Sequence, residues 1–153
     1  MGFSLGGLCK LLAAATNGQV RCCVGLDPVE AGQKGAAVAK KLRILSAVLQ
    51  AEPGPCNANG NARQMVTGLS GPLFVLRMRN AMHCDLEQPT DWLAELVCGE
   101  ADPGRQAIFE RYPLTVLKVV FYGDAPSLAT LAAATNHAGV RDLSTRAPKD
   151  FKY

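Results

Sequence analysis

Few residues in the chain are of types that could carry chemistry, and the cysteines come first. Six cysteines stand at positions 9, 22, 23, 56, 84 and 98, and none has the C-x-x-C spacing of zinc or thioredoxin-like sites. Cys9 and Cys98 fall in apolar runs, where a free thiol packs as a small hydrophobic group. Cys22 and Cys23 could form a metal or redox pair with His137, but no other ligand is identifiable. We therefore expect no metal, no cofactor and a reducing compartment, the cytoplasm or the nucleus.

A catalytic triad is the second candidate, at His83-Cys84-Asp85. Neighbouring side chains on a helix point apart, so these three cannot form a triad by themselves and are interpreted as a helix end. The glycine-rich stretch 2–7 lacks the Gly-Lys-Ser/Thr of a phosphate loop, and the polar stretch 57–61 lacks the carboxylates of a calcium loop. The sequence thus favours a protein that is not an enzyme, with a cysteine-dependent enzyme or redox protein as the weaker alternative.

Composition favours a single helical domain. Hydrophobic residues make up 48% of the chain and aromatic ones only 6%, so the apolar mass is mostly Leu, Ala and Val, which suits packed helices. The net charge of +3 is mild, and the basic residues are scattered rather than gathered on one segment. No apolar stretch approaches the ~20 residues that a membrane span needs. We expect one domain over 1–153, with no nucleic-acid and no membrane partner.

An internal repeat supplies the main argument for the fold. The phrase Leu-Ala-Ala-Ala-Thr-Asn occurs at 12–17 and again at 131–136. Arg21, Arg63 and Arg105 recur at a spacing of about 42 residues, within the ~40–47 residues of armadillo and HEAT units. The segments 72–77 and 113–118 also share their text. The predicted units are a partial one near 1–20, then 21–62, 63–104 and 105–141, followed by a tail at 142–153.

Helix signals fit these units. The clearest predicted helix spans 36–51, whose apolar face carries Val38, Leu42, Leu45 and Leu49. Further helices are expected at 5–16, 90–99 and 125–136, and others begin at Pro72 and Pro113. Thr90 or Asp91 would cap the helix at 90–99, and Asp124 or Ser127 the helix at 125–136.

The order of elements resembles an armadillo repeat, or the related HEAT unit. Trp92–Gly99, Arg105–Glu110, Pro113–Leu117 and then Gly123-Asp124 follow the family's succession of helices and turns. The resemblance implies an all-α fold, a right-handed α-solenoid of about three repeats; an irregular helical bundle is the alternative. Family members that bind extended peptides carry Asn four residues after a Trp. Leu96 stands there in this chain, so an asparagine ladder is not implied.

Stacked solenoid units form a curved surface, so the function expected from the resemblance is a protein–protein interaction module or scaffold. A structural accessory subunit of a larger complex is the alternative. The basic side chains favour an acidic protein or peptide as partner, held on the solenoid face. Asn17 and Asn136 stand at helix ends, where C-capping is the favoured role, and Trp92 has the spacing of a core residue. The candidate partner-binding residues are Lys10, Asn17, Lys40, Arg43, Trp92 and Asn136.

Overall fold

The centre of the molecule is a mixed β-sheet; the computed structural model describes residues 1–71, 73–87, 90–134 and 139–142. The strands are β1 (Gly2–Phe3), β2 (Cys22–Leu26), β3 (Leu45–Gln50), β4 (Leu73–Met78) and β5 (Val140–Asp142). They lie in the order β1-β2-β3-β4-β5, the first four parallel and β5 antiparallel to β4. The fold is therefore α/β. The expected all-α solenoid of armadillo-like repeats and its alternative, an irregular helical bundle, are both wrong.

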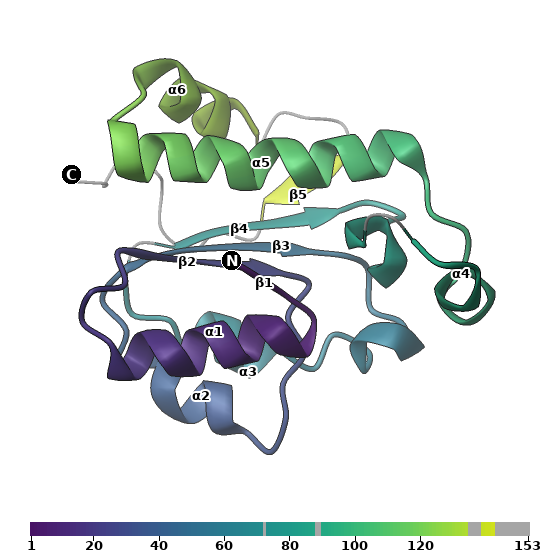
Figure 1. The fold of residues 1–153 in the computed structure, drawn as a ribbon, viewed down its shortest axis with the longest axis horizontal. Coiled ribbons are helices and arrows are strands. Elements are labelled where there is room, and N and C mark those ends of the chain that lie inside the picture. The colour runs from purple at the N-terminus through teal and green to yellow at the C-terminus, as the bar shows by residue number, and fades with distance from the viewer. Residues whose placement is uncertain (72, 88–89, 135–138, 143–153) are drawn as a thin grey trace.

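Helices cover both faces of this sheet. They are α1 (Leu5–Thr16), α2 (Lys34–Ala39), α3 (Arg63–Thr67), α4 (Trp92–Cys98), α5 (Pro103–Tyr122) and α6 (Ala125–Ala133). Two 3-10 turns, η1 (Pro55–Asn57) and η2 (His83–Leu86), follow β3 and β4. Helices α1, α2 and α3 lie on one face, α5 and α6 lie on the other, and α4 lies beyond one end of the sheet (Figure 1). Within the described residues, no helix has the length and apolar character needed to cross a membrane.

Each face of the sheet has its own hydrophobic core, because side chains alternate between faces along a strand. On β4, Phe74 and Leu76 pack under α5 with Val116, whereas Val75 packs toward α1 and α3 with Leu8. A strand buried on both faces has a nearly continuous apolar sequence, as β3 and β4 do.

This double burial explains why the helix predicted over 36–51 is wrong. The chain forms α2 up to Ala39, turns, and then enters β3 at Leu45. A short apolar run is compatible with a buried strand as well as with a helix, and periodicity alone does not distinguish them.

The repeated text does not correspond to repeated structure. Arg21 directly precedes β2, Arg63 begins α3, and Arg105 lies in the first turn of α5. Pro113 lies inside α5, although the matching text after residue 72 forms β4. The phrase at 12–17 ends α1, and its copy overlaps the end of α6, so the match reflects the high helix propensity of Leu and Ala.

Parallel strands bring their carboxyl ends to the same edge of a sheet, where open α/β folds place their ligand sites. Ser4 follows β1, Asp27 follows β2, and the η2 turn comes shortly after β4. The functional residues described next all come from this edge.

Candidate functional site

Ser4 occupies a sharp turn between strand β1 and helix α1. Its φ of 52° and ψ of −128° place a residue with a side chain in a backbone region that normally favours glycine. Ser4 is also the N-cap of α1, yet its hydroxyl makes no capping hydrogen bond. Serine at an N-cap usually caps the helix through that hydroxyl. The Ser4 hydroxyl is thus not used to cap the helix, which makes Ser4 a candidate functional residue.

Backbone hydrogen bonds fix the strained residue on both sides. The Ser4 N–H donates to the Leu26 carbonyl at 3.0 Å, and the Val29 N–H donates to the Ser4 carbonyl at 3.1 Å. Both contacts join Ser4 to the segment around Asp27. The turn after β1 and the turn after β2 are therefore one rigid unit.

Glycines allow the close packing of this turn. A side chain on Gly2 would collide with the backbone carbonyl of Gly6, and a Cβ on Gly7 would lie 2.8 Å from the Pro28 Cβ. The glycine-rich stretch 2–7, which lacks the pattern of a phosphate loop, therefore has a steric role. Its glycines allow α1 to begin directly against β1 and the loop after β2.

Asp27 is the buried carboxylate of the site. It directly follows β2, adopts a positive φ of 38° and is 2% exposed. One carboxylate oxygen, Oδ1, accepts the Ala51 N–H at 3.2 Å, and the other, Oδ2, accepts the Asn57 side-chain N–H at 2.9 Å. Burial without these donors would be costly, so the donors hold the carboxylate in one orientation.

His83 joins Asp27 to the serine turn. Its Nδ1 lies 2.7 Å from Asp27 Oδ2, and its ring stacks on that of Phe3 with centroids 4.5 Å apart. Phe3 is the residue before Ser4. When Nδ1 carries the ring proton, it donates a hydrogen bond to Asp27 Oδ2, and Nε2 of the neutral ring is then free to accept a proton.

A second buried carboxylate, Asp85, fixes the backbone of the His83 turn. Its Oδ2 accepts the Met82 N–H at 2.7 Å and the Arg105 Nε–H at 2.7 Å, and its Oδ1 accepts the Asp102 N–H at 2.8 Å. The hydrogen bond to Asp85 raises the pKa of the Arg105 guanidinium above its ordinary value. The turn that carries His83 is thereby anchored to the start of α5.

One pair of cysteines is bonded, although free thiols were expected from the sequence. Cys56 and Cys98 form a disulfide with Cα atoms 5.8 Å apart, so Cys98 is not a free thiol and one basis for a reducing compartment is lost. Cys84 is buried, and its thiol donates to the Gly99 carbonyl at 2.9 Å. Burial raises the pKa of Cys22, Cys23 and Cys84, which lowers the reactivity of all three thiols. Among the described residues, no group of His, Cys, Asp and Glu could hold a metal ion.

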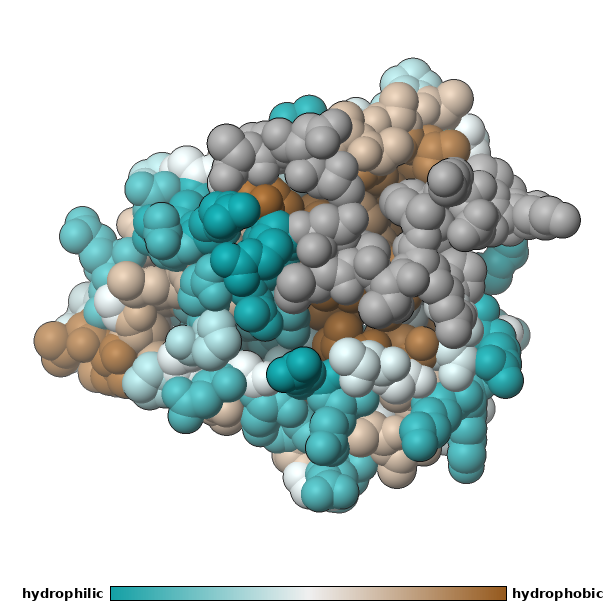
Figure 2. Space-filling model, turned by 180° about the vertical axis from the view of Figure 1, so that it is seen from behind, coloured by the Kyte–Doolittle hydropathy of each residue, from teal (hydrophilic) through white to brown (hydrophobic). Residues whose placement is uncertain are grey.

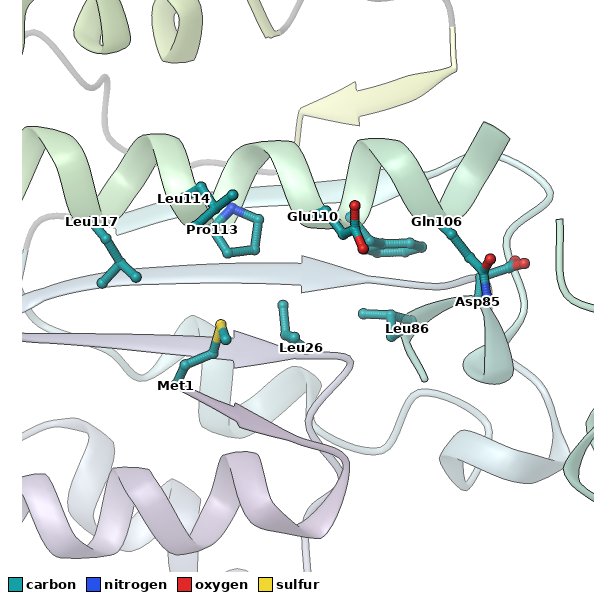
Figure 3. A pocket seen from close by; sticks show the side chains of 10 residues that line it. Met1, Leu26, Asp85, Leu86, Gln106, Glu110, Pro113, Leu114 and Leu117 are labelled. Atoms are coloured by element: carbon teal, nitrogen blue, oxygen red, sulfur yellow. The ribbon is translucent and has the colours of Figure 1, made fainter. Parts of the chain in front are cut away.

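An apolar pocket of about 420 Å³ lies between α5 and the edge formed by β1 and β2 (Figure 3). Two of its lining residues border the site: Leu26 directly precedes Asp27, and Leu86 ends the turn that begins with His83. The other lining residues are Met1, Asp85, Gln106, Phe109, Glu110, Pro113, Leu114 and Leu117.

The structure does not gather the predicted partner-binding residues into one site. Lys10 is exposed on α1, Lys40 and Arg43 are exposed between α2 and β3, and Asn136 lies outside the described residues. Asn17 follows α1 with an extended φ of −124°, so the expected left-handed C-cap is wrong; its side chain accepts the Gln19 N–H instead.

Trp92 is not a core residue, contrary to its apolar spacing. It is 75% exposed, and together with Leu93, Leu96 and Val97 it forms an exposed apolar face on α4. Figure 2 shows this hydrophobic end of the molecule at the left. Helix α4 lies beyond one end of the sheet, whereas α1, which carries Lys10, lies on one of its faces (Figure 1).

Ser4 and Asp27 were missed in the sequence, and His83 was considered only together with Cys84 and Asp85, although two signals were present. Gly2-Phe3-Ser4-Leu5-Gly6 has the G-x-S-x-G pattern of a nucleophile elbow, which stands between a strand and a helix. The order Ser, Asp, His along the chain is the order that accompanies this elbow. Neither a scan against protein-family models nor a search of curated proteins finds a match to the chain.

Proposed function

We propose that the chain is a serine hydrolase that cleaves carboxylic esters through Ser4. The observation that carries the proposal is the strained Ser4 turn together with the His83–Asp27 pair at 2.7 Å, at one edge of a parallel sheet. A strand–serine–helix turn followed along the chain by an acid and a histidine is the arrangement of α/β-hydrolases. Because triads are recognised by geometry and roles, the arrangement supports the activity without a sequence match.

Each residue has a role in acyl transfer. Ser4 Oγ attacks the ester carbonyl carbon while His83 Nε2 takes the hydroxyl proton, and Asp27 stabilises the imidazolium that results. The tetrahedral intermediate collapses as His83 gives its proton to the departing alcohol. Water then attacks the acyl group on Ser4 by the same proton transfers, which releases the carboxylic acid and restores the serine.

Helix α1 supplies charge stabilisation at the carbonyl oxygen. Leu5 is the first residue of α1, and N–H groups of a first turn have no partner within the helix. The residue after the nucleophile is a known source of one oxyanion donor in this arrangement. The positive end of the helix dipole acts in the same direction.

The surroundings of the site favour an ester with an apolar group. The pocket beside Leu26 and Leu86 is lined mainly by aliphatic and aromatic side chains of α5 and the sheet edge. Ligand pockets of this composition bind the apolar part of a substrate and leave its polar part to a few placed groups. We expect p-nitrophenyl hexanoate to have a higher kcat/KM than p-nitrophenyl acetate.

The Cys56–Cys98 disulfide favours an oxidising compartment for this hydrolase. The expected cytoplasmic or nuclear location rested on free cysteines. Thiol titration of the unfolded, unreduced protein distinguishes the two: four reactive thiols agree with the disulfide, because Cys9, Cys22, Cys23 and Cys84 are free, whereas all cysteines would react without it.

The interaction module expected from the sequence stays an untested prediction. Its partner-binding surface was the curved face of stacked helical units, and the α/β fold has no such units among the described residues. Ester hydrolysis by the purified protein distinguishes a hydrolase from a scaffold, because a scaffold does not turn over substrate.

Hydrolysis of p-nitrophenyl acetate by the purified chain tests the proposal. Ser4→Ala removes the nucleophile, so we expect a loss of about 10³-fold or more in kcat with unchanged circular dichroism. Ser70→Ala is the matched control, because the Ser70 hydroxyl donates to the Lys40 carbonyl on another part of the surface. Equal hydrolysis by wild type and Ser4→Ala, or none by folded wild type with any ester of the series, would overturn the proposal.

A further inference from the structure

The side chain of Asn57 is buried directly behind Asp27. Asn57 is 1% exposed, and its Nδ2 donates to Asp27 Oδ2 at 2.9 Å and to the Glu52 carbonyl at 2.9 Å. Its Oδ1 accepts the Gly54 N–H at 2.9 Å and the Gly60 N–H at 3.0 Å. All the hydrogen-bonding groups of the amide are thus occupied. Two donors face its oxygen and two acceptors face its nitrogen, so the amide has only one orientation.

This fixed amide acts on the oxygen that His83 uses. Asp27 Oδ2 accepts from both Asn57 Nδ2 and His83 Nδ1, while Asp27 Oδ1 accepts from the Ala51 backbone. A carboxylate held by two fixed donors cannot rotate about its Cβ–Cγ bond without losing them. The direction in which Oδ2 meets the imidazole is therefore set by the hydrogen bonds from Asn57 and Ala51.

We propose that Asn57 is a positioning residue of the hydrolase, which fixes the Asp27 carboxylate so that His83 keeps Nδ1 protonated and Nε2 free toward Ser4. The inference rests on the proposed function above. Outer partners that orient a functional side chain carry much of a site's precision, because displacements near 1 Å already lower rates.

The turn that carries Asn57 is itself held in place. Pro55 begins η1, and Cys56, the residue before Asn57, is bonded to Cys98 at the end of α4. Two glycine-containing turns close around the Asn57 amide oxygen. The amide is thus presented to Asp27 by a braced turn.

Asn61 provides a matched control in the same loop. Its amide accepts the Glu30 N–H at 2.8 Å and donates to the Glu30 carbonyl at 2.9 Å. Asn61 therefore ties two backbone segments together, as Asn57 does with Gly54 and Gly60, and it makes no hydrogen bond to Asp27. A difference between the two asparagines isolates the contact with the carboxylate.

A double-mutant cycle tests the positioning role. We expect Asn57→Ala to lower kcat for p-nitrophenyl acetate about 10- to 100-fold, as loss of a hydrogen bond to a charged group does, with KM within about twofold. In the Asp27→Asn background the same substitution should change kcat by less than about twofold, because the carboxylate it orients is already gone. Asn61→Ala should give the same fold-change in both backgrounds.

Asn57→Asp gives a second readout that keeps the turn intact. Its carboxylate still accepts from Gly54 and Gly60, but it replaces the N–H donor with an oxygen facing Asp27. Two adjacent carboxylates cannot both stay ionised cheaply. We expect the ratio of its kcat to that of wild type to rise as the pH falls, because a protonated carboxyl again donates to Asp27. Of the described titratable groups, Asp27 is hydrogen-bonded to position 57 directly, and His83 contacts the same Asp27 oxygen.

The outcomes separate the positioning role from the hydrolase proposal. A similar loss from Asn57→Ala in both backgrounds, or a pH-independent ratio for Asn57→Asp, would overturn the positioning role while Ser4→Ala and Asp27→Asn still lower kcat as the proposed function requires. If Ser4→Ala and Asp27→Asn leave hydrolysis unchanged, the proposed function fails and the positioning role fails with it.

Discussion

Two buried aspartates hold the His83 turn, and they are satisfied in different ways. Asp27 is 2% exposed and Asp85 is 1% exposed, and each accepts at least three hydrogen bonds. Asp85 is neutralised by the guanidinium of Arg105, whose charge is permanent. Among the described residues, the donors to Asp27 are uncharged groups of Ala51 and Asn57 together with His83, which is cationic when protonated. The Asp27 cluster can thus stabilise a charge that appears and disappears, and the Asp85 cluster cannot.

Burial alone therefore does not identify a functional carboxylate. Asp27 contacts His83 directly, and Asp85 stands two positions after His83 in the sequence. Each carboxylate accepts at least three hydrogen bonds. The distinguishing feature is the partner, which is the titratable imidazole of His83 for Asp27 and the permanently charged guanidinium of Arg105 for Asp85. The Cys56–Cys98 disulfide links the two clusters. Cys56 directly precedes Asn57, which is hydrogen-bonded to Asp27. Cys98 directly precedes Gly99, whose carbonyl accepts the thiol of Cys84, the residue before Asp85.

The largest expected effect is on the Asp27 side. Asp27→Asn should lower kcat for ester hydrolysis about 10⁴-fold, because the amide reverses the donor–acceptor pattern that sets the His83 tautomer. Steady-state kinetics measures this, and urea unfolding should show that the variant is folded. A reduction of less than about tenfold in a folded protein would remove the distinction between the two aspartates.

The disulfide comes next. Cys98→Ser should lower the free energy of unfolding by about 3–4 kcal/mol in a chain-entropy account, since the bond closes a loop with a sequence separation of 42. Urea unfolding without reductant measures the change, and Cys9→Ser, which removes an exposed free thiol, is the control. Equal stability of wild type and Cys98→Ser would mean that the two clusters are not covalently braced.

On the Asp85 side the expected effect is on stability rather than on turnover. Arg105→Ala leaves a buried carboxylate without its cation and should lower the free energy of unfolding by about 2–3 kcal/mol, allowing for the 24% exposure of the Arg105 side chain. The kcat of the folded variant should stay within about tenfold of wild type. Arg111→Ala, an exposed position on the same helix, should change stability by less than about 0.5 kcal/mol.

The pH dependence of this pair has a definite sign. Because the hydrogen bond to Asp85 raises the folded-state pKa of Arg105, the stabilisation is fully present below the unfolded pKa and is lost only as the pH rises through the higher folded pKa. The stability difference between wild type and Arg105→Ala should therefore be constant from about pH 7 to about pH 10. A difference that vanished within this range would contradict the assignment of Arg105 to Asp85.

The smallest expected effect concerns Cys84, which lies between the clusters. Burial raises the pKa of its thiol above the usual 9.0, so labelling by a thiol reagent at about pH 8 should be much slower than at exposed Cys9. A raised folded pKa stabilises the protein below the unfolded pKa, and this contribution declines as the pH rises through the folded value. Labelling of Cys84 as fast as Cys9, mapped by mass spectrometry, would show that the His83 turn opens readily.

Local helix signals in the sequence were sufficient for several elements. The helix predicted at 5–16 is α1, and the helices predicted at 90–99 and 125–136 correspond to α4 and α6. Asp91 and Asp124 cap these helices, each accepting a backbone N–H three residues later. Capping depends on a few neighbouring residues, so it can be predicted without knowledge of the fold.

The sheet and the site could not be predicted in the same way. The apolar runs of β3 and β4 fit a helix or a buried strand, and only their pairing across the sheet decides between them. Spacing in the sequence cannot place His83 on Asp27, which precedes it by 56 positions, because that contact exists only once β2 and β4 lie in the same sheet. The G-x-S-x-G pattern at Ser4 was the one local signal of the site. The apparent 42-residue repeat instead favoured a helical solenoid without an active site.

Covalent labelling by a fluorophosphonate ester tests whether Ser4 is the nucleophile, since the Ser4 oxygen forms a bond to phosphorus as fluoride leaves and His83 takes the proton. We predict a single adduct per chain, mapped to Ser4 by mass spectrometry. Its rate should fall at least about 100-fold in Asp27→Asn and should be retained in Arg105→Ala. No adduct on the folded wild type, an adduct on another residue, or equal rates in wild type and Asp27→Asn would contradict the account.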